Sequence, residues 1–66
     1  MYSQELQDLT TKMLKELPMA MMKHKDAKYG VLILEDNIYV ISDRDNNAKY
    51  HFYSVEELLL DGWVVD

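Results

Sequence analysis

Hydrophobic residues recur every three to four positions at the start of the chain, which is the spacing of one face of an α-helix. The stripe consists of Tyr2, Leu6, Leu9, Met13 and Leu17. Ser3 precedes the stripe as a candidate N-cap, and Pro18 follows it and disfavours helix at the preceding residue. We therefore predict an amphipathic helix over residues 3–16.

Residues 19–27 have a pattern that fits two structures. The stretch is rich in methionine, alanine and lysine, which favour helix, and Pro18 suits a first helical position. The same residues could form an edge strand that turns at Lys25-Asp26-Ala27. We favour a helical turn here and keep the strand as the alternative.

Two runs of β-branched and aromatic residues, 29–35 and 38–42, predict strands joined by Asp36-Asn37. Asp and Asn tolerate positive φ, so a two-residue hairpin is expected. A polar loop over 43–48 leads to a third strand, 49–53, in which Tyr50 and Phe52 share one face.

Ser54 and Glu57 have the spacing of a capping box, and Tyr53 and Leu58 occupy the positions of a hydrophobic staple. The helix that follows is expected to end near Asp61, with Gly62 as its left-handed terminator. Residues 63–65 then form a tail or a short strand. The expected fold is a single α+β domain over 1–66: an amphipathic helix, a three-stranded antiparallel meander, a short capped helix and a terminal strand-like segment.

The two hairpin strands carry apolar residues on both faces, whereas a sheet with one wet face shows strict alternation. Val31 and Ile33 lie on one face, and Leu32 and Leu34 on the other. The first helix can cover one of the faces. Cover for the second must come from residues 63–65, from the methionine segment, or from another protein. We therefore expect either a homodimer or a surface for a partner.

Composition and charge narrow the class of protein. The 66 residues include no cysteine, which excludes disulfides and thiolate zinc sites, and 48% are hydrophobic, which is too many for a disordered chain. The formal net charge of −5 excludes a basic footprint over the whole domain. No apolar run is long enough to span a bilayer, and no basic segment opens a signal peptide, so we expect a cytoplasmic protein without membrane contact.

Motifs for catalysis, metal or cofactor binding are weak. The loop that begins at Asp43 has three oxygen ligands at calcium-loop spacing, but Ala48 replaces the required glycine and Ser54 the bidentate glutamate. His24 and His51 lie in no metal-binding spacing, and we expect both to face solvent. There is no nucleophile elbow or phosphate-binding loop. We expect no enzymatic activity, no metal and no cofactor.

Charge is divided unevenly along the chain. Residues 1–28 carry five lysines against four acids, a net of +1, and residues 29–66 carry two basic residues against eight acids, a net of −6. We predict a small acidic protein-interaction module, an inhibitor or regulator of a basic partner such as a nucleic-acid-binding protein. The candidate binding residues are Asp43, Asp45, Glu56, Glu57, Asp61 and the aromatics Tyr39, Tyr53 and Trp63, which we expect to be exposed. The alternative is a dimeric nucleic-acid-binding regulator that uses Lys23, Lys25 and Lys28.

Overall fold

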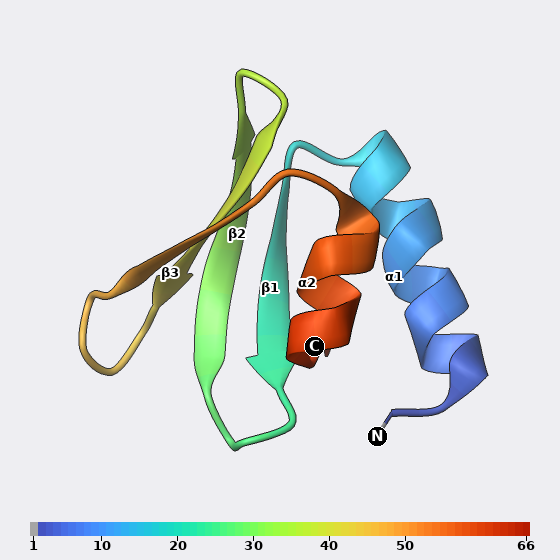
Figure 1. Ribbon diagram of the computed structural model, residues 1–66, viewed down its shortest axis with the longest axis horizontal. Helices are drawn as coiled ribbons and strands as arrows, with labels where there is room; N and C mark the ends of the chain where they lie inside the picture. Colours follow the sequence, from blue (N-terminus) through green and yellow to red (C-terminus); the bar gives the residue numbers. More distant parts are fainter. Residues whose placement is uncertain (1) are drawn as a thin grey trace.

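A computed structural model describes residues 2–66 and shows two layers, a sheet with both helices on one of its faces (Figure 1). The sheet has five strands in the order β4-β3-β2-β1-β5, and every pairing is antiparallel. The predicted α+β class is confirmed. In chain order the elements are α1 (Gln4–Glu16), β1 (Met19–His24), β2 (Tyr29–Glu35), β3 (Ile38–Asp43), β4 (Lys49–Phe52), α2 (Val55–Asp61) and β5 (Trp63–Val65).

Helix α1 begins and ends as its sequence predicts. The Ser3 hydroxyl accepts a hydrogen bond from the Leu6 N–H at 3.2 Å, and the backbone is extended at Leu17, before Pro18. The buried face of the helix, however, is rotated away from the predicted stripe. Thr10 and Leu14 are buried, whereas Leu9 and Leu17 are exposed.

Residues 19–24 form a strand, so the helical turn favoured for this stretch is wrong. β1 pairs with β2 on one side and with β5 on the other, and its side chains alternate between the two faces of the sheet. Met22 and His24 point inward and are buried, and Met19 and Met21 are exposed. Pairing on both sides outweighs a helix propensity that amounts to a few tenths of a kcal/mol per residue.

The β2–β3 hairpin and the loop after it form as expected. Asp36 and Asn37 both have positive φ, 49° and 66°, which is the conformation of a type I′ turn. In the 43–48 loop, the Asp43 carboxylate accepts from the Asp45 N–H at 2.8 Å, and the Asn47 N–H donates to the Asp43 carbonyl at 3.1 Å. These bonds make the loop an Asx-type turn.

The caps of α2 follow the prediction with one difference. The Ser54 hydroxyl accepts from the Glu57 N–H at 3.2 Å, and the Glu57 carboxylate accepts from the Tyr53 N–H at 2.8 Å, one residue before the position that a capping box uses. Tyr53 is 70% exposed and forms no staple with the buried Leu58. Gly62 ends the helix at φ 108°.

β5 is an edge strand that α1 covers. The side chain of Thr10 is fully buried and its hydroxyl makes two bonds, donating to the Leu6 carbonyl at 2.8 Å and accepting from the Val65 N–H at 3.0 Å. The N–H of Val65 points away from β1. Because β5 is the edge of the sheet, no other strand of residues 2–66 lies on that side to accept its hydrogen bond. The core lies between this edge, α2 and the inner side of the sheet, around Leu14, Met22, Leu32, Ile41, Leu58 and Trp63.

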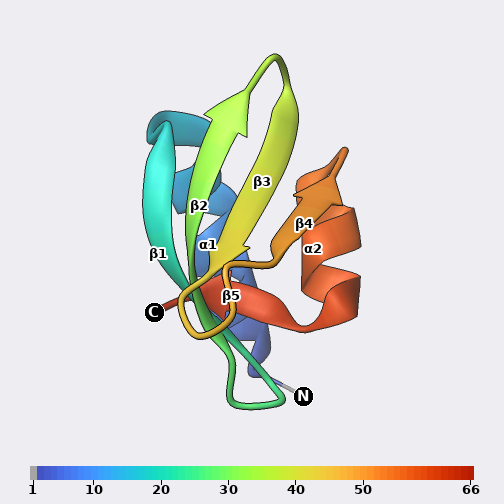
Figure 2. The same cartoon turned by 90° about the vertical axis from the view of Figure 1, so that its left-hand side faces the viewer.

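The other side of the sheet is covered by neither helix, as Figure 2 shows with the strands in front and α1 behind them. Strand registers place seven apolar residues of β1, β2 and β3 on this side, which we call the outer sheet face: Met19, Met21, Tyr29, Val31, Ile33, Ile38 and Val40. The methionine segment extends this face instead of covering it. Residues 63–65 contribute to the buried core.

Candidate functional site

Helix α2 presents an exposed face that combines carboxylates with apolar side chains. Burial of Val55 and Leu58 directs Glu56, Glu57, Leu60 and Asp61 to solvent, while Leu59 packs against the core. We call this surface the α2 face; it consists of Tyr53, Glu56, Glu57, Leu60 and Asp61. Leu60 is 85% exposed, the largest value among the exposed large hydrophobic residues of the described chain. The helix has no basic residue in its last turn to balance the three carboxylates.

Two clefts border the α2 face. One, of about 430 Å³, lies between the helices and the β1–β2 turn and is lined by Leu60, Glu56, Gln7 and Lys25 among others. The second, of about 400 Å³, is lined by Tyr39, Tyr53, Glu56 and Lys15 among others. Glu56 borders both clefts, whereas Leu60 lines only the first and Tyr53 only the second.

Four of the eight predicted binding residues thus lie together on α2 or directly before it: Tyr53, Glu56, Glu57 and Asp61. Tyr39 is half-buried and lines the second cleft. Asp45 is exposed in the β3–β4 loop.

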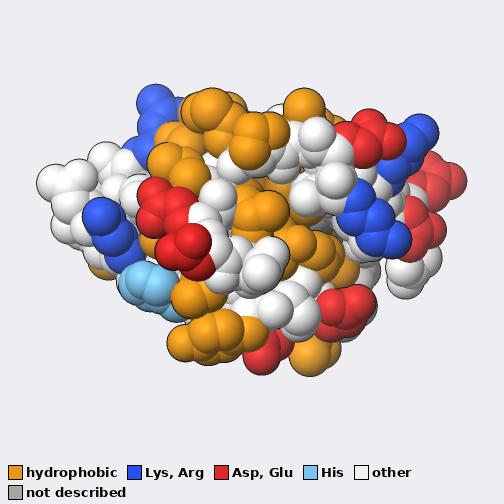
Figure 3. Space-filling view, turned by 90° about the horizontal axis from the view of Figure 1, so that it is seen from above, with side chains coloured by type: hydrophobic (Ala, Val, Ile, Leu, Met, Phe, Trp, Pro, Cys, Tyr) orange, Lys and Arg blue, Asp and Glu red, His pale blue; other side chains and the backbone are white. Residues whose placement is uncertain are grey.

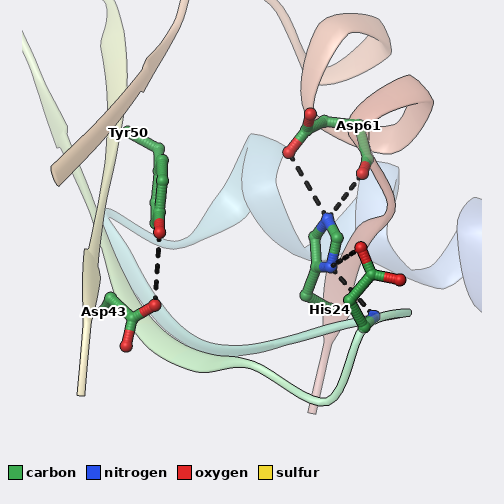
Figure 4. A network of polar contacts seen from close by, with 5 residues as sticks. His24, Asp43, Tyr50 and Asp61 are labelled. Atoms are coloured by element: carbon green, nitrogen blue, oxygen red, sulfur yellow. Dashed lines mark hydrogen bonds and ion pairs between the residues drawn. The ribbon is translucent and has the colours of Figure 1, made fainter. Parts of the chain in front are cut away.

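Asp43 is buried, so its predicted place in an exposed acidic patch is wrong. Its side chain points to the inner side of the sheet, because Asp43 is paired with the inward-facing Gly30. The carboxylate accepts from the Asp45 N–H and from the Tyr50 hydroxyl at 3.3 Å (Figure 4). It therefore anchors the β3–β4 turn and is not available to a partner.

Trp63 is fully buried, which contradicts the expectation that it is exposed. Its ring lies edge-on to His24, with centroids 4.8 Å apart, and is tilted against Tyr50 at 5.8 Å. Pairing of β5 with β1 opposite His24 turns the indole into the core.

His24 is also buried, although we expected it at the surface. Figure 4 shows its ring between the β1–β2 turn and the end of α2. Nε2 lies 2.6 Å from the Asp61 carbonyl and 3.4 Å from the Asp61 carboxylate, and the Asp26 N–H lies 3.0 Å from Nδ1. Two-residue alternation from Met22 would have placed His24 inside, had residues 19–24 been assigned to a strand. Within residues 2–66, no group of three His, Cys, Asp or Glu side chains could hold a metal.

The three lysines of the nucleic-acid alternative engage three different neighbours. The Lys23 ammonium lies 5.6 Å from the centre of the Tyr2 ring, and that of Lys28 lies 5.4 Å from the centre of the Tyr50 ring. Lys25 packs its methylene groups close to Gly62. They do not form a continuous basic stripe, so the alternative gains no support from this arrangement.

Tyr2 links this region to the outer sheet face. Burial raises the pKa of its phenol above the usual value, and the nearby Tyr29 and Asp66 raise this pKa further by charge repulsion. The neutral phenol is therefore the form that the folded protein favours. The Tyr2 side chain also lines the cleft between the helices and the β1–β2 turn.

The outer sheet face is a second candidate surface. Met19, Met21, Tyr29 and Ile33 are each between 42% and 56% exposed. Figure 3 looks along the strands from the end where the β2–β3 turn lies, so this face is seen edge-on, and hydrophobic side chains lie among acidic and basic ones at that end of the molecule. An apolar surface of this extent is typical of a protein-contact region.

Comparisons with known proteins add no assignment. No protein-family model matches the chain, and neither curated proteins nor solved structures provide a match. Neither helix in the described residues 2–66 is long and apolar enough to cross a membrane.

Proposed function

We propose that the protein is a small non-enzymatic interaction module that binds a basic partner protein through the α2 face. The observation that carries the proposal is the exposure of Leu60 among three carboxylates, beside an exposed Tyr53. Single exposed leucines are common on protein surfaces, but this one lines the cleft between the helices and the β1–β2 turn. An aliphatic anchor, an aromatic side chain and charged groups around them are the usual parts of a binding hot spot.

The apolar and the charged side chains of the α2 face are expected to contribute differently to binding. Burial of one leucine in a partner pocket stabilises a complex by roughly 1.5–3 kcal/mol. The carboxylates of Glu56, Glu57 and Asp61 remain at the rim, where charge accelerates association and selects the partner more than it adds affinity. The partner therefore has an apolar depression bordered by lysine or arginine.

The charge distribution supports a regulatory or inhibitory role toward such a partner. The acidic half of the sequence, with its net charge of −6 over residues 29–66, includes the whole of the α2 face. A protein that binds nucleic acid offers a basic surface to a polyanion, and an acidic module that occupies this surface competes with the nucleic acid.

The proposal is tested by capture from an extract of the source cells on immobilised protein, compared across variants. Leu60→Gln removes the apolar anchor and Glu56→Lys reverses one rim charge. Leu9→Gln is the matched control, because Leu9 is a 47% exposed leucine on α1. We expect a basic protein that is retained by the unaltered chain and by Leu9→Gln, and that is lost with Leu60→Gln and weakened with Glu56→Lys. Equal retention by all four proteins contradicts the proposal.

A further inference from the structure

The outer sheet face has charged residues at its two ends, and its middle is apolar over β1 and β2 and partly polar over β3 and β4. The registers place Glu35 in the last row of the face, near the β2–β3 turn. Lys23 pairs with Tyr29 in the row at the opposite end, and the Arg44 N–H donates to the Tyr29 carbonyl at 2.8 Å. The two rows between contain, first, Met19, Ile33, Val40 and His51 and, second, Met21, Val31, Ser42 and Lys49.

We propose that the occupant of this face is a second copy of the same chain, packed sheet against sheet. The proposal concerns a surface separate from the α2 face and does not depend on the function proposed for that helix. Sheets that pack face to face lie about 10 Å apart with strands nearly aligned, and their apolar side chains interdigitate. A twofold axis is the symmetry that joins two identical patches without leaving either one open.

The charges select the direction of that axis. With the axis across the strands, each row of one copy faces the row at the mirrored position of the other copy. Glu35 then faces Tyr29, beside Lys23 of the second copy, and Met19 and Ile33 face Met21 and Val31. Toward the β4 edge, Val40 faces Ser42 and His51 faces Lys49, so the basic side chain of Lys49 stays at the margin of the contact. With the axis along the strands, Met21 would instead face Lys49, which buries a charge against an apolar side chain.

The small area of the outer sheet face limits the affinity of the dimer. Four strands at about 4.8 Å and rows that extend over about 20 Å give a footprint of roughly 400 Å² per copy. Stable complexes commonly bury about 800 Å² per partner, so this dimer belongs to the weak class, with a dissociation constant expected in the micromolar range or above. Concentration is therefore the first variable of the test.

Sedimentation equilibrium from about 10 μM to 1 mM measures the association, and a charge-reversal cycle tests its geometry. Within one copy Glu35 and the Lys23 row are about 20 Å apart, which exceeds the Debye length of about 8 Å at physiological salt. Any coupling between these two residues therefore acts between copies. We expect Glu35→Lys and Lys23→Glu each to weaken the dimer about tenfold, and the double variant to regain most of the loss.

The net charges of the variants separate a specific contact from general repulsion between copies. Glu35→Lys reduces the net charge from −5 to −3, so general repulsion between copies falls, yet the proposal expects weaker association. The double variant has the net charge of the unaltered chain. Glu16→Lys, an exposed position on the helix side, carries the same charge change and is expected to leave the dimer intact. Far-ultraviolet circular dichroism checks that each variant is folded.

Three results would overturn the proposal. A monomer at 1 mM protein shows that the face does not bind a second copy, and a different protein is then its partner. A dimer that Glu35→Lys leaves unchanged uses another surface or another axis. A double variant that stays as weak as the two single variants shows that Glu35 and Lys23 do not face each other.

Discussion

Thr10→Val is the substitution that most directly tests how α1 protects the edge of β5. Valine has nearly the shape of threonine and similar helix propensity, so the helix itself should be little affected. The change removes the acceptor of the Val65 N–H. This N–H is buried and points away from β1, the strand with which β5 pairs. The Leu6 carbonyl keeps its place in the helix ladder and is not left alone.

The expected cost is the desolvation penalty of one orphaned backbone donor, about 1–3 kcal/mol. For a domain of this size each kcal/mol lowers the melting temperature by about 4–8 °C. The single tryptophan, Trp63, is fully buried, so its fluorescence reports unfolding in urea without an added probe. Loss of protection of the Val65 amide in hydrogen exchange locates the effect at the edge strand.

Thr11→Val is the matched control for Thr10→Val. The Thr11 hydroxyl also bonds back along the helix, to the Gln7 carbonyl at 3.1 Å, but it accepts nothing from a strand. Its removal should change the free energy of unfolding by less than about 0.5 kcal/mol. If Thr10→Val and Thr11→Val have the same urea midpoint, the Thr10 hydroxyl does not seal the edge and the reasoning is refuted.

Three further outcomes are expected. Gly30→Ala should lower the urea midpoint by the equivalent of about 1–3 kcal/mol, because a Cβ there would lie 2.8 Å from the Ser42 carbonyl oxygen; an unchanged midpoint would show that the strands can separate freely. Gly62→Ala should cost about 1–2 kcal/mol in thermal unfolding, because φ is 108°, and a stability gain would rule out this strain. Above pH 10 the unfolded Tyr2 phenol ionises before the folded one, whose pKa is raised, so stability falls as pH rises. Tyr2→Phe should reduce that loss between pH 9 and pH 11 in urea titrations, and an equal loss in both proteins would argue against the raised pKa.

The sequence predicts the elements that local signals define. Caps at Ser3 and Ser54, the positive-φ pair Asp36-Asn37 and the terminator Gly62 all lie where the sequence places them. Each acts through bonds within a few residues, so neighbouring sequence contains the information. The lack of alternation in the hairpin also predicts an uncovered apolar face, and the structure has one.

The errors occur where distant segments determine the outcome. Residues 19–24 form a strand because β2 and β5 pair with them on both sides. The helix propensity of these residues depends on local sequence alone and does not reflect those partners. The buried Thr10 hydroxyl accepts from the Val65 N–H, 55 positions away in the sequence. The hydrophobic pattern of the helix cannot predict that contact. His24, Asp43 and Trp63 were all expected at the surface and lie inside for the same reason. Half of the predicted binding residues gather at α2 because they are neighbours in sequence, and burial of Val55 and Leu58 turns them toward solvent.

The position of β5 at the end of the described chain, paired with the first strand, has a consequence for the order of folding. Residues 63–65 supply Trp63 to the core and cover one edge of β1, yet they are synthesised after the rest of the fold. Until they emerge, a nascent chain has an open β1 edge and an unfilled apolar interior, both of which promote aggregation. The hairpins can form early because they are local, but the closing step is a long-range contact that must wait for the last strand.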